Sequence, residues 1–137
     1  MNKDKQLNVV FLSEFDKELE RFVRKKKFKK LPAQVDELEK QLQDGKIPGK
    51  FIRRAEEPEP YEVYKLRLPN PDANAGKSDG YRIYYLVVTA WRIIVLMTVY
   101  YKKEQETVSD AYIDGLIDGF FFDAMPYEET DEQNLDN

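Results

Sequence analysis

Residues 61–101 carry the pattern that most constrains how this chain can fold. Residues 61–68, YEVYKLRL, alternate with a period of two, which predicts a β-strand with two different faces. One face carries Tyr64, Leu66 and Leu68, and the other carries Val63, Lys65 and Arg67. Residues 81–89 and 91–101 are rich in β-branched and aromatic side chains, as inner strands of a sheet are. The segment 69–80, PNPDANAGKSDG, predicts a long hairpin loop between the first two strands.

The rest of the chain has mainly helical patterns. Apolar residues recur at helical spacing between residues 13 and 27 and again between 31 and 43, and a short apolar segment at 9–12 precedes both. After residue 104 the pattern becomes helical again, as far as Phe122. We therefore expect an α+β fold with an N-terminal strand, a two-helix hairpin, a three-stranded antiparallel sheet and a C-terminal helix.

Charge is distributed unevenly along the chain. The 137 residues have a formal net charge of −4, but residues 1–107 hold all 22 Lys and Arg and 17 of the 26 acidic residues, a net of +5. Residues 108–137 hold the other nine acidic residues and no Lys or Arg, a net of −9. We expect a single domain at 1–122 with a basic body, followed by an acidic, flexible tail at 123–137. The overall acidity therefore does not argue against a nucleic-acid partner.

Two residue types are absent, and their absence narrows the possible chemistry. The chain has no cysteine and no histidine. It can form neither a disulfide nor a thiolate metal site, and proton transfer near neutral pH must use lysine, tyrosine or a carboxylate. No apolar segment is long enough for a signal peptide or a membrane span. These features predict a cytoplasmic protein that uses no cofactor and no membrane.

Three motifs occur in an order that is typical of one protein family. They are Tyr64-Lys65-Leu66-Arg67-Leu68, Gly76-Lys77-Ser78-Asp79-Gly80-Tyr81-Arg82 and Tyr101-Lys102-Lys103-Glu104-Gln105. With these motifs, residues 8–115 resemble the RelE/HigB group of the RelE/ParE superfamily, the toxins of bacterial type II toxin–antitoxin pairs. The resemblance implies a RelE-like fold and an endoribonuclease that cuts messenger RNA on the ribosome. It also implies three partners, which are a cognate antitoxin protein, mRNA and the ribosome.

The resemblance further implies catalytic roles for four cations. These are Lys65 as proton acceptor, Arg67 and Arg82 as stabilisers of the transition state, and Lys103 as the group that assists the leaving oxygen. Some members of the family have arginine where this chain has Lys103, and some have a late tyrosine that stacks on a base where this chain has Ser109. Tyr100 or Tyr101 is the alternative stacking surface.

The spacing of the cations supports the same chemistry. Lys65 and Arg67 lie two apart on one strand and so project from the same face. If the hairpin pairs Leu68 with Tyr81, Arg67 lies opposite Arg82, a like-charge pair that costs stability unless an anion binds there. RNA supplies its own nucleophile, the 2′-hydroxyl, so positive side chains suffice for much of the catalysis. Further RNA contacts are predicted at Arg53, Arg54, Lys77, Tyr100, Tyr101 and Lys102.

Each of these features also has an ordinary structural explanation. Lys65 and Arg67 can be solubilising cations of a half-exposed strand, and Arg82 can be a salt-bridge partner of Glu62 or Asp79. The cationic run at 24–30 is more often a solvated surface than an RNA site. Carboxylates spaced by four at 110, 114 and 118 are more often the polar face of a helix than a metal site, so we predict no metal.

Two other functional classes stay open. A ParE-like toxin shares this fold but poisons DNA gyrase by binding, without cutting RNA. A non-catalytic member of the same fold acts only as an interaction module. The four cations argue against the first class, whereas Lys103 and Ser109 give some support to the second.

Overall fold

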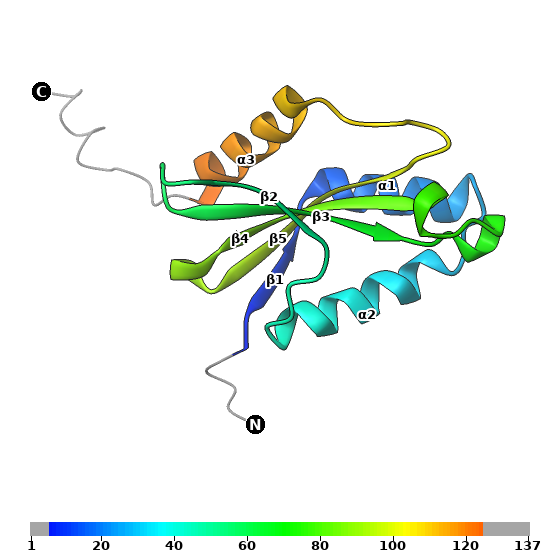
Figure 1. Ribbon diagram of the computed structural model, residues 1–137, viewed down its shortest axis with the longest axis horizontal. Helices are drawn as coiled ribbons and strands as arrows, with labels where there is room; N and C mark the ends of the chain where they lie inside the picture. The colour runs from blue at the N-terminus through cyan, green and yellow to red at the C-terminus, as the bar shows by residue number, and fades with distance from the viewer. Residues whose placement is uncertain (1–5, 125–137) are drawn as a thin grey trace, which may run out of the picture.

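A five-stranded sheet forms the centre of the molecule. In the computed structural model, which describes residues 6–124, the strand order is β1-β5-β4-β3-β2 (Figure 1). β1 lies parallel to β5, and every other neighbouring pair is antiparallel. The strands are β1 Asn8–Phe11, β2 Lys50–Ala55, β3 Tyr61–Leu68, β4 Tyr81–Val88 and β5 Ile93–Tyr101. Together with its helices, this mixed sheet confirms the predicted α+β class.

Three helices cover the two faces of this sheet (Figure 1). They are α1 Ser13–Arg24, α2 Leu31–Gln43 and α3 Asp110–Ala124. The apolar residues of α1 and α2, with Phe15 and Leu42 fully buried, pack against one face. Those of α3, including Ile117 and Phe120, pack against the other. β4 is therefore buried along its whole length, and each large apolar side chain fully buried in this way contributes roughly 2 kcal/mol.

β3 and β4 pair in the register that the sequence suggested. Leu68 pairs with Tyr81 and Arg67 with Arg82. Tyr64, Leu66 and Leu68 pack on the side of α1 and α2, whereas Val63 packs on the side of α3. The predicted division of β3 into two faces and the assumed register are both confirmed. Lys65 and Arg67 thus lie on the α3 side, because alternate residues of a strand share a face.

The sheet is larger than the three-stranded sheet that we expected. β1 joins it beyond β5, and β2, which was not predicted, pairs with β3. β2 is an edge strand whose register shifts between Phe51 and Arg53, and most of its side chains are exposed. A bulge of this kind breaks the period-two pattern, so KFIRRA shows no clean alternation in the sequence.

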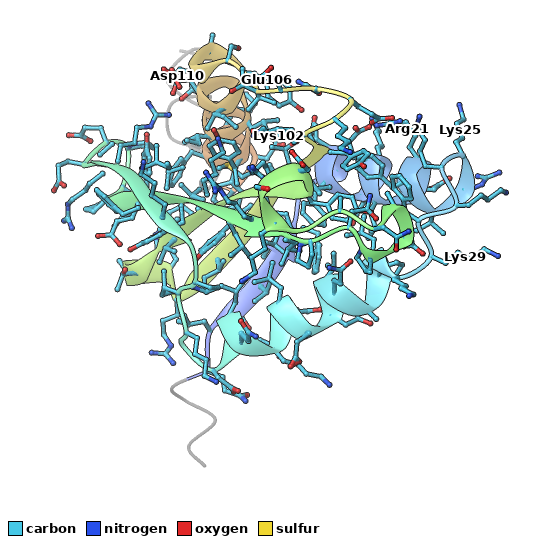
Figure 2. All side chains as sticks on the ribbon, turned by 45° about the vertical axis from the view of Figure 1, so that its right-hand side comes forward. Arg21, Lys25, Lys29, Lys102, Glu106 and Asp110 are labelled. Atoms are coloured by element: carbon cyan, nitrogen blue, oxygen red, sulfur yellow. The ribbon has the colours of Figure 1, made fainter. Side chains whose placement is uncertain are left out.

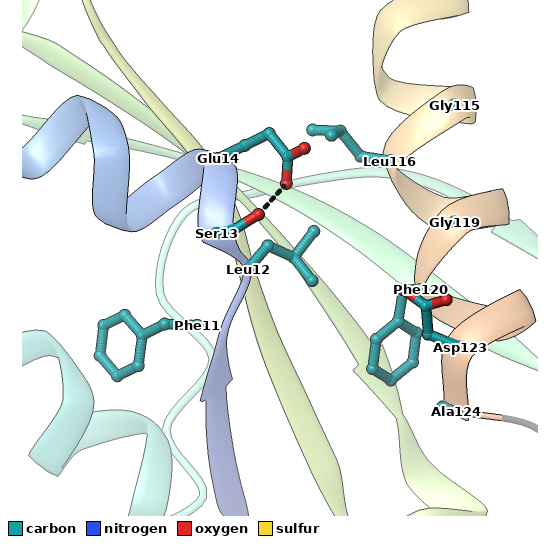
Figure 3. A pocket seen from close by; sticks show the side chains of 10 residues that line it. All are labelled: Phe11, Leu12, Ser13, Glu14, Gly115, Leu116, Gly119, Phe120, Asp123 and Ala124. Carbon is teal, nitrogen blue, oxygen red and sulfur yellow. Dashed lines mark hydrogen bonds between the residues drawn. The ribbon is translucent and has the colours of Figure 1, made fainter.

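The C-terminal helix extends slightly beyond its predicted end. α3 includes Asp123 and Ala124, two residues that we had assigned to the acidic tail. The remainder of that predicted tail, residues 125–137, lies outside the described residues. The described helix ends beside the groove that is shown in Figure 3.

Candidate nucleic-acid interface

α3 covers only part of its face of the sheet, and the uncovered part carries positive charge. The apolar side of α3 packs around Val63, Leu86 and Val95. Further along the same face lie cations from β2, β3 and β4 and from the residue that follows β5. We name these five residues the cationic cluster: Lys50, Lys65, Arg67, Arg82 and Lys102.

Lys65 lies at the centre of the cationic cluster. Its Nζ atom is 5.4 Å from the centroid of the Tyr84 ring, and its cross-strand neighbour on β2 is Lys50. Partial burial lowers the pKa of Lys65, and the positive charges of Arg82, Arg67, Lys50 and Lys102 lower it further. The surroundings of Lys65 therefore favour its neutral amine, which is the form that can accept a proton.

Arg82 lies beneath the surface rather than on it. The residue is 3% exposed, and its guanidinium donates to the backbone carbonyls of Lys77 and Ser78, each at 2.8 Å, and to its own neighbour Tyr81 at 3.2 Å. Burial and the charge of Arg67 lower the pKa of Arg82. Three neutral carbonyls accept hydrogen bonds from the guanidinium but do not cancel its charge, so Arg82 supplies a fixed positive potential. The same hydrogen bonds hold the 77–79 turn.

This placement refines the role that we predicted for Arg82. The guanidinium forms no direct salt bridge with Glu62 or Asp79, although the charge of Asp79 acts on it. Direct contact with a phosphate is also not possible in this conformation, because the side chain is almost completely covered. The exposed guanidinium of the pair is that of Arg67.

No carboxylate of residues 6–124 forms a salt bridge with the cationic cluster, although the charge of Asp79 acts on Arg82. Within residues 6–124, every salt bridge involves Arg21, Arg24, Lys26, Arg53 or Arg54. The five members of the cluster form none. Surface lysines and arginines usually gain little from a salt bridge, but five neighbouring cations that all lack one repel each other. An arrangement of this kind is expected to attract an anion.

Arg53 and Arg54, two predicted RNA contacts on β2, point to opposite faces of the sheet. Arg53 pairs with Val63 and reaches the α3 side, where its guanidinium forms a salt bridge with Asp114. Arg54 lies on the other side, bound to Glu56 at 2.7 Å and close to Glu62. Arg53 is thus close to the cluster but occupied by a carboxylate, and Arg54 is separated from it by the sheet.

The two tyrosines that we predicted to stack on a base are both buried. Tyr100 is 2% exposed, and Tyr101 is 7% exposed and packs against Phe28 on the side of α1 and α2. In this conformation neither ring can stack on a nucleotide, because both complete the sheet packing. Tyr112, in the first turns of α3, is the exposed aromatic residue of this region, at 42%. It lines a pocket together with Tyr100, Thr107 and other residues.

Of the two lysines that follow β5, Lys102 and not Lys103 lies on the face of the cationic cluster. The backbone N–H of Lys102 donates to the carbonyl of Gly80 at 2.9 Å, which continues the β4–β5 ladder by one residue. The alternation of the strand then places Lys102, like Tyr100, on the α3 side, and its charge acts on Lys65. Lys103, the predicted leaving-group residue, is exposed in the following turn. In the view of Figure 2, Lys102 lies between α3 and the end of α1.

Lys77 borders the cationic cluster, and Lys50 is a member of the cluster that the sequence did not predict. The exposed side chain of Lys77, a predicted RNA contact, lines a groove together with Arg67 and the apolar Leu66 and Leu38. Lys50 was not among the predicted residues, although it pairs directly with Lys65. Only the position of β2 reveals it, and the sequence carried no clear signal for that strand.

A salt-bridge network holds the turn that carries Lys102. The Glu104 carboxylate binds Arg21 at 2.8 Å and Lys26 at 2.9 Å, both from α1 or the residues just after it. Hydrogen bonding to Arg21 lowers the pKa of Glu104. The 101–104 turn is therefore tied to α1, and the positions of Lys102 and Lys103 depend on this tie.

A groove elsewhere on the molecule does not suit an anionic ligand. It has a volume of about 360 Å³ and lies between α3 and the junction of β1 with α1 (Figure 3). Its charged lining residues are Glu14 and Asp123, and Ser13 donates a hydrogen bond to Glu14. Because these charges are negative, phosphate binding is expected at the cationic cluster instead.

Among residues 6–124, no group of three or more acidic side chains could hold a metal ion, and no helix is long and apolar enough to cross a membrane. No family model matches the chain, and no curated protein or solved structure matches it either.

Proposed function

We propose that this chain is an endoribonuclease toxin of the RelE/HigB type, and that its fold is the RelE-like arrangement with β2 as an additional edge strand. The observation that carries the proposal is the cationic cluster at the open end of one sheet face, whose five positive residues form no salt bridge with a carboxylate of the described part of the chain. Its charge complements a phosphate, and it includes a lysine whose pKa is lowered. In the proposed function, the free protein cuts mRNA on the ribosome. A bound antitoxin covers the site.

The proposed mechanism uses the nucleophile that RNA itself provides. The neutral amine of Lys65 accepts the proton of the 2′-hydroxyl, whose oxygen attacks the adjacent phosphorus. The bond from phosphorus to the 5′-oxygen breaks, which leaves a 2′,3′-cyclic phosphate, and the departing oxygen takes a proton from Lys102, Lys103 or water. Arg67 contacts the phosphate oxygens, whose negative charge grows in the transition state, while buried Arg82 adds its potential from below.

A cleavage assay with a matched pair of variants tests this proposal. The purified chain is added to a translation reaction, and the 5′ ends of the mRNA are mapped. We expect new ends within codons, and we expect Arg67→Gln to slow their formation by about a hundredfold, the scale of losing one charge stabiliser. Lys46→Gln, which removes one exposed cation from the loop after α2, should cut at the normal rate.

The same assay separates the alternative classes. Loss of DNA supercoiling by gyrase without new mRNA ends would identify a ParE-like toxin. If neither effect occurs and the chain is folded, the protein is a binding module and the nuclease proposal is wrong. Full activity of a folded Arg67→Gln variant would show that Arg67 does not stabilise the transition state.

A further inference from the structure

The connection between α1 and α2 carries a second concentration of positive charge. Residues 24–30 have the sequence RKKKFKK, and we name this segment the cationic run. Two of its cations are neutralised, Arg24 by Glu20 at 2.7 Å and Lys26 by Glu104 at 2.9 Å. The other four are exposed and form no salt bridge with a carboxylate of residues 6–124: Lys25, Lys27, Lys29 and Lys30.

One lysine of the cationic run occupies a backbone position that favours glycine. Lys27 has φ 62°, in the left-handed region, and turns the chain so that the Phe28 N–H donates to the carbonyl of Phe22 at 3.0 Å. Helices commonly end with glycine at such a position, because other residues are strained there. Cations near a helix C-terminus interact favourably with the helix dipole, but this effect is confined to the last turn. Lys27 lies beyond it, so the dipole does not explain the residue.

The cationic run has a fixed backbone. The Phe28 ring packs against Tyr101, Tyr81 and Phe22, with centroid distances of 5.4, 6.1 and 5.9 Å. The backbone N–H of Lys30 donates to the Asp72 carboxylate at 2.9 Å, which ties the run to the 69–80 loop (Figure 1). Because this backbone is fixed, less conformational entropy is lost when the run binds an anion than when a flexible tail does.

The cationic run contacts the 101–104 turn, which also carries Lys102 of the cationic cluster. Glu104, which binds Lys26, follows Lys102 by two residues in the same turn. Phe28 packs directly on Tyr101, the residue before Lys102. In Figure 2, Lys25 and Lys29 extend from the end of the molecule where α1 ends, and Lys102 lies between that end and α3. The run packs on the α1–α2 side and the cluster lies on the α3 side, so a polyanion that contacts both would pass around the end of β5 at the 101–104 turn.

We infer that the cationic run binds the phosphate backbone of base-paired RNA next to the strand that is cut. The class of ligand rests on the proposed function. Phosphate is the expected contact because the run offers lysines, and paired RNA is favoured because single-strand binders use aromatic stacking platforms. The run's one aromatic ring, Phe28, is half-buried and packs against Tyr101, Tyr81 and Phe22. A membrane surface is disfavoured for the same reason, since interfacial segments expose an apolar face.

Binding of an RNA hairpin that cannot be cut tests the inference separately from catalysis. The 2′-hydroxyls of the hairpin are methylated, and its affinity for the chain is measured over a range of salt concentrations. We expect Lys27→Gly to raise the melting temperature, because it relieves the left-handed backbone, and to weaken binding severalfold. The slope of log affinity against log salt should fall by about 1 for each lysine removed. The double variant Lys25→Gln/Lys29→Gln should lower it by about 2.

A matched control removes two cations from another part of the surface. Lys40→Gln/Lys46→Gln changes exposed lysines of α2 and the loop after it, and should leave the hairpin affinity nearly unchanged. Equal losses in the two double variants would mean a non-specific charge effect and would overturn the inference. So would a loss that is the same for an unpaired RNA of equal length, or binding to phosphatidylglycerol vesicles that depends on the run while hairpin binding does not. If the chain cuts no RNA but the variants lose hairpin binding, only the nuclease proposal fails.

Discussion

Arg67 and Arg82 pair across β3 and β4, and no carboxylate of the described residues 6–124 forms a salt bridge with either. Opposite charges in such positions stabilise a sheet by about 0.2–1 kcal/mol, and like charges destabilise it. The two residues nevertheless differ in function, because one is exposed and the other is buried under three carbonyls. The pair is therefore best understood as one contact residue and one residue that positions the turn and supplies charge.

Lys65 should give the cleavage reaction a characteristic pH dependence. Because burial and four neighbouring cations lower its pKa below the ordinary value near 10.5, the neutral amine forms at a lower pH, and the rate should rise with pH until that pKa is passed. Lys65→Arg keeps the charge but cannot lose a proton, so we expect at least about a hundredfold slower cleavage with little pH dependence. Single-turnover rates across the alkaline range measure this effect.

The same lysine links stability to pH with a definite sign. Its pKa is lower in the folded state, so between the folded and unfolded pKa values the unfolded chain binds more protons, and the free energy of unfolding rises with pH. Below that window the penalty for burying the charge is fully present. Urea unfolding of a Lys65→Met variant should lack this rise.

A Lys65→Arg enzyme with the rate and pH profile of the original would show that Lys65 is not the base.

At the scale of elements, β2 and α3 are joined across the end of the sheet by Arg53 and Asp114. The side chains are 38% and 50% exposed, so breaking the salt bridge should cost no more than about 1 kcal/mol of stability. Asp114→Asn also releases the Arg53 guanidinium beside the cationic cluster. We expect a small loss in the free energy of unfolding and severalfold tighter RNA binding at low salt, measured with the uncut hairpin. Asp118→Asn, on the exposed surface of α3, is the control, and tighter binding by both variants would argue against a specific role of Arg53.

The elements also show which parts of the structure the sequence can reveal. Alternation in YEVYKLRL is enough to place Lys65 and Arg67 on one face. The turn residues of 69–80 predict a hairpin, but the register that places Arg67 opposite Arg82 was an assumption, and only the structure confirms it. β2 could not be found, because a bulge in an exposed edge strand removes the periodic signal, and Lys50 was missed with it. The burial of Tyr100 and Tyr101 depends on packing partners far away in the sequence, among them Phe28. Local pattern carries no information about such contacts.

For the whole molecule, the decisive property is the separation of charge rather than its sum. The net charge of −4 combines a basic body with an acidic C-terminal region, and five acidic residues and no basic residue lie in 125–137. Long-range attraction acts over about 10 Å at 0.1 M salt and about 3 Å at 1 M. We therefore expect the negative charge of the C-terminal region to compete with RNA for the cationic cluster at low salt. At high salt this competition should disappear.

Removal of residues 125–137 tests this competition. The truncated chain has a net charge of +1, because five negative charges are removed from −4. We expect its affinity for the uncut hairpin to rise severalfold at low ionic strength and to converge with that of the full chain as salt increases, since screening weakens the intramolecular term as well as the binding itself. A chain of full length in which these five acids are replaced by their amides should behave like the truncated one, because charge and not chain length is responsible. Identical affinities of the full and truncated chains at low salt would show that the acidic segment serves another purpose, such as solubility, and that the body meets RNA without internal competition.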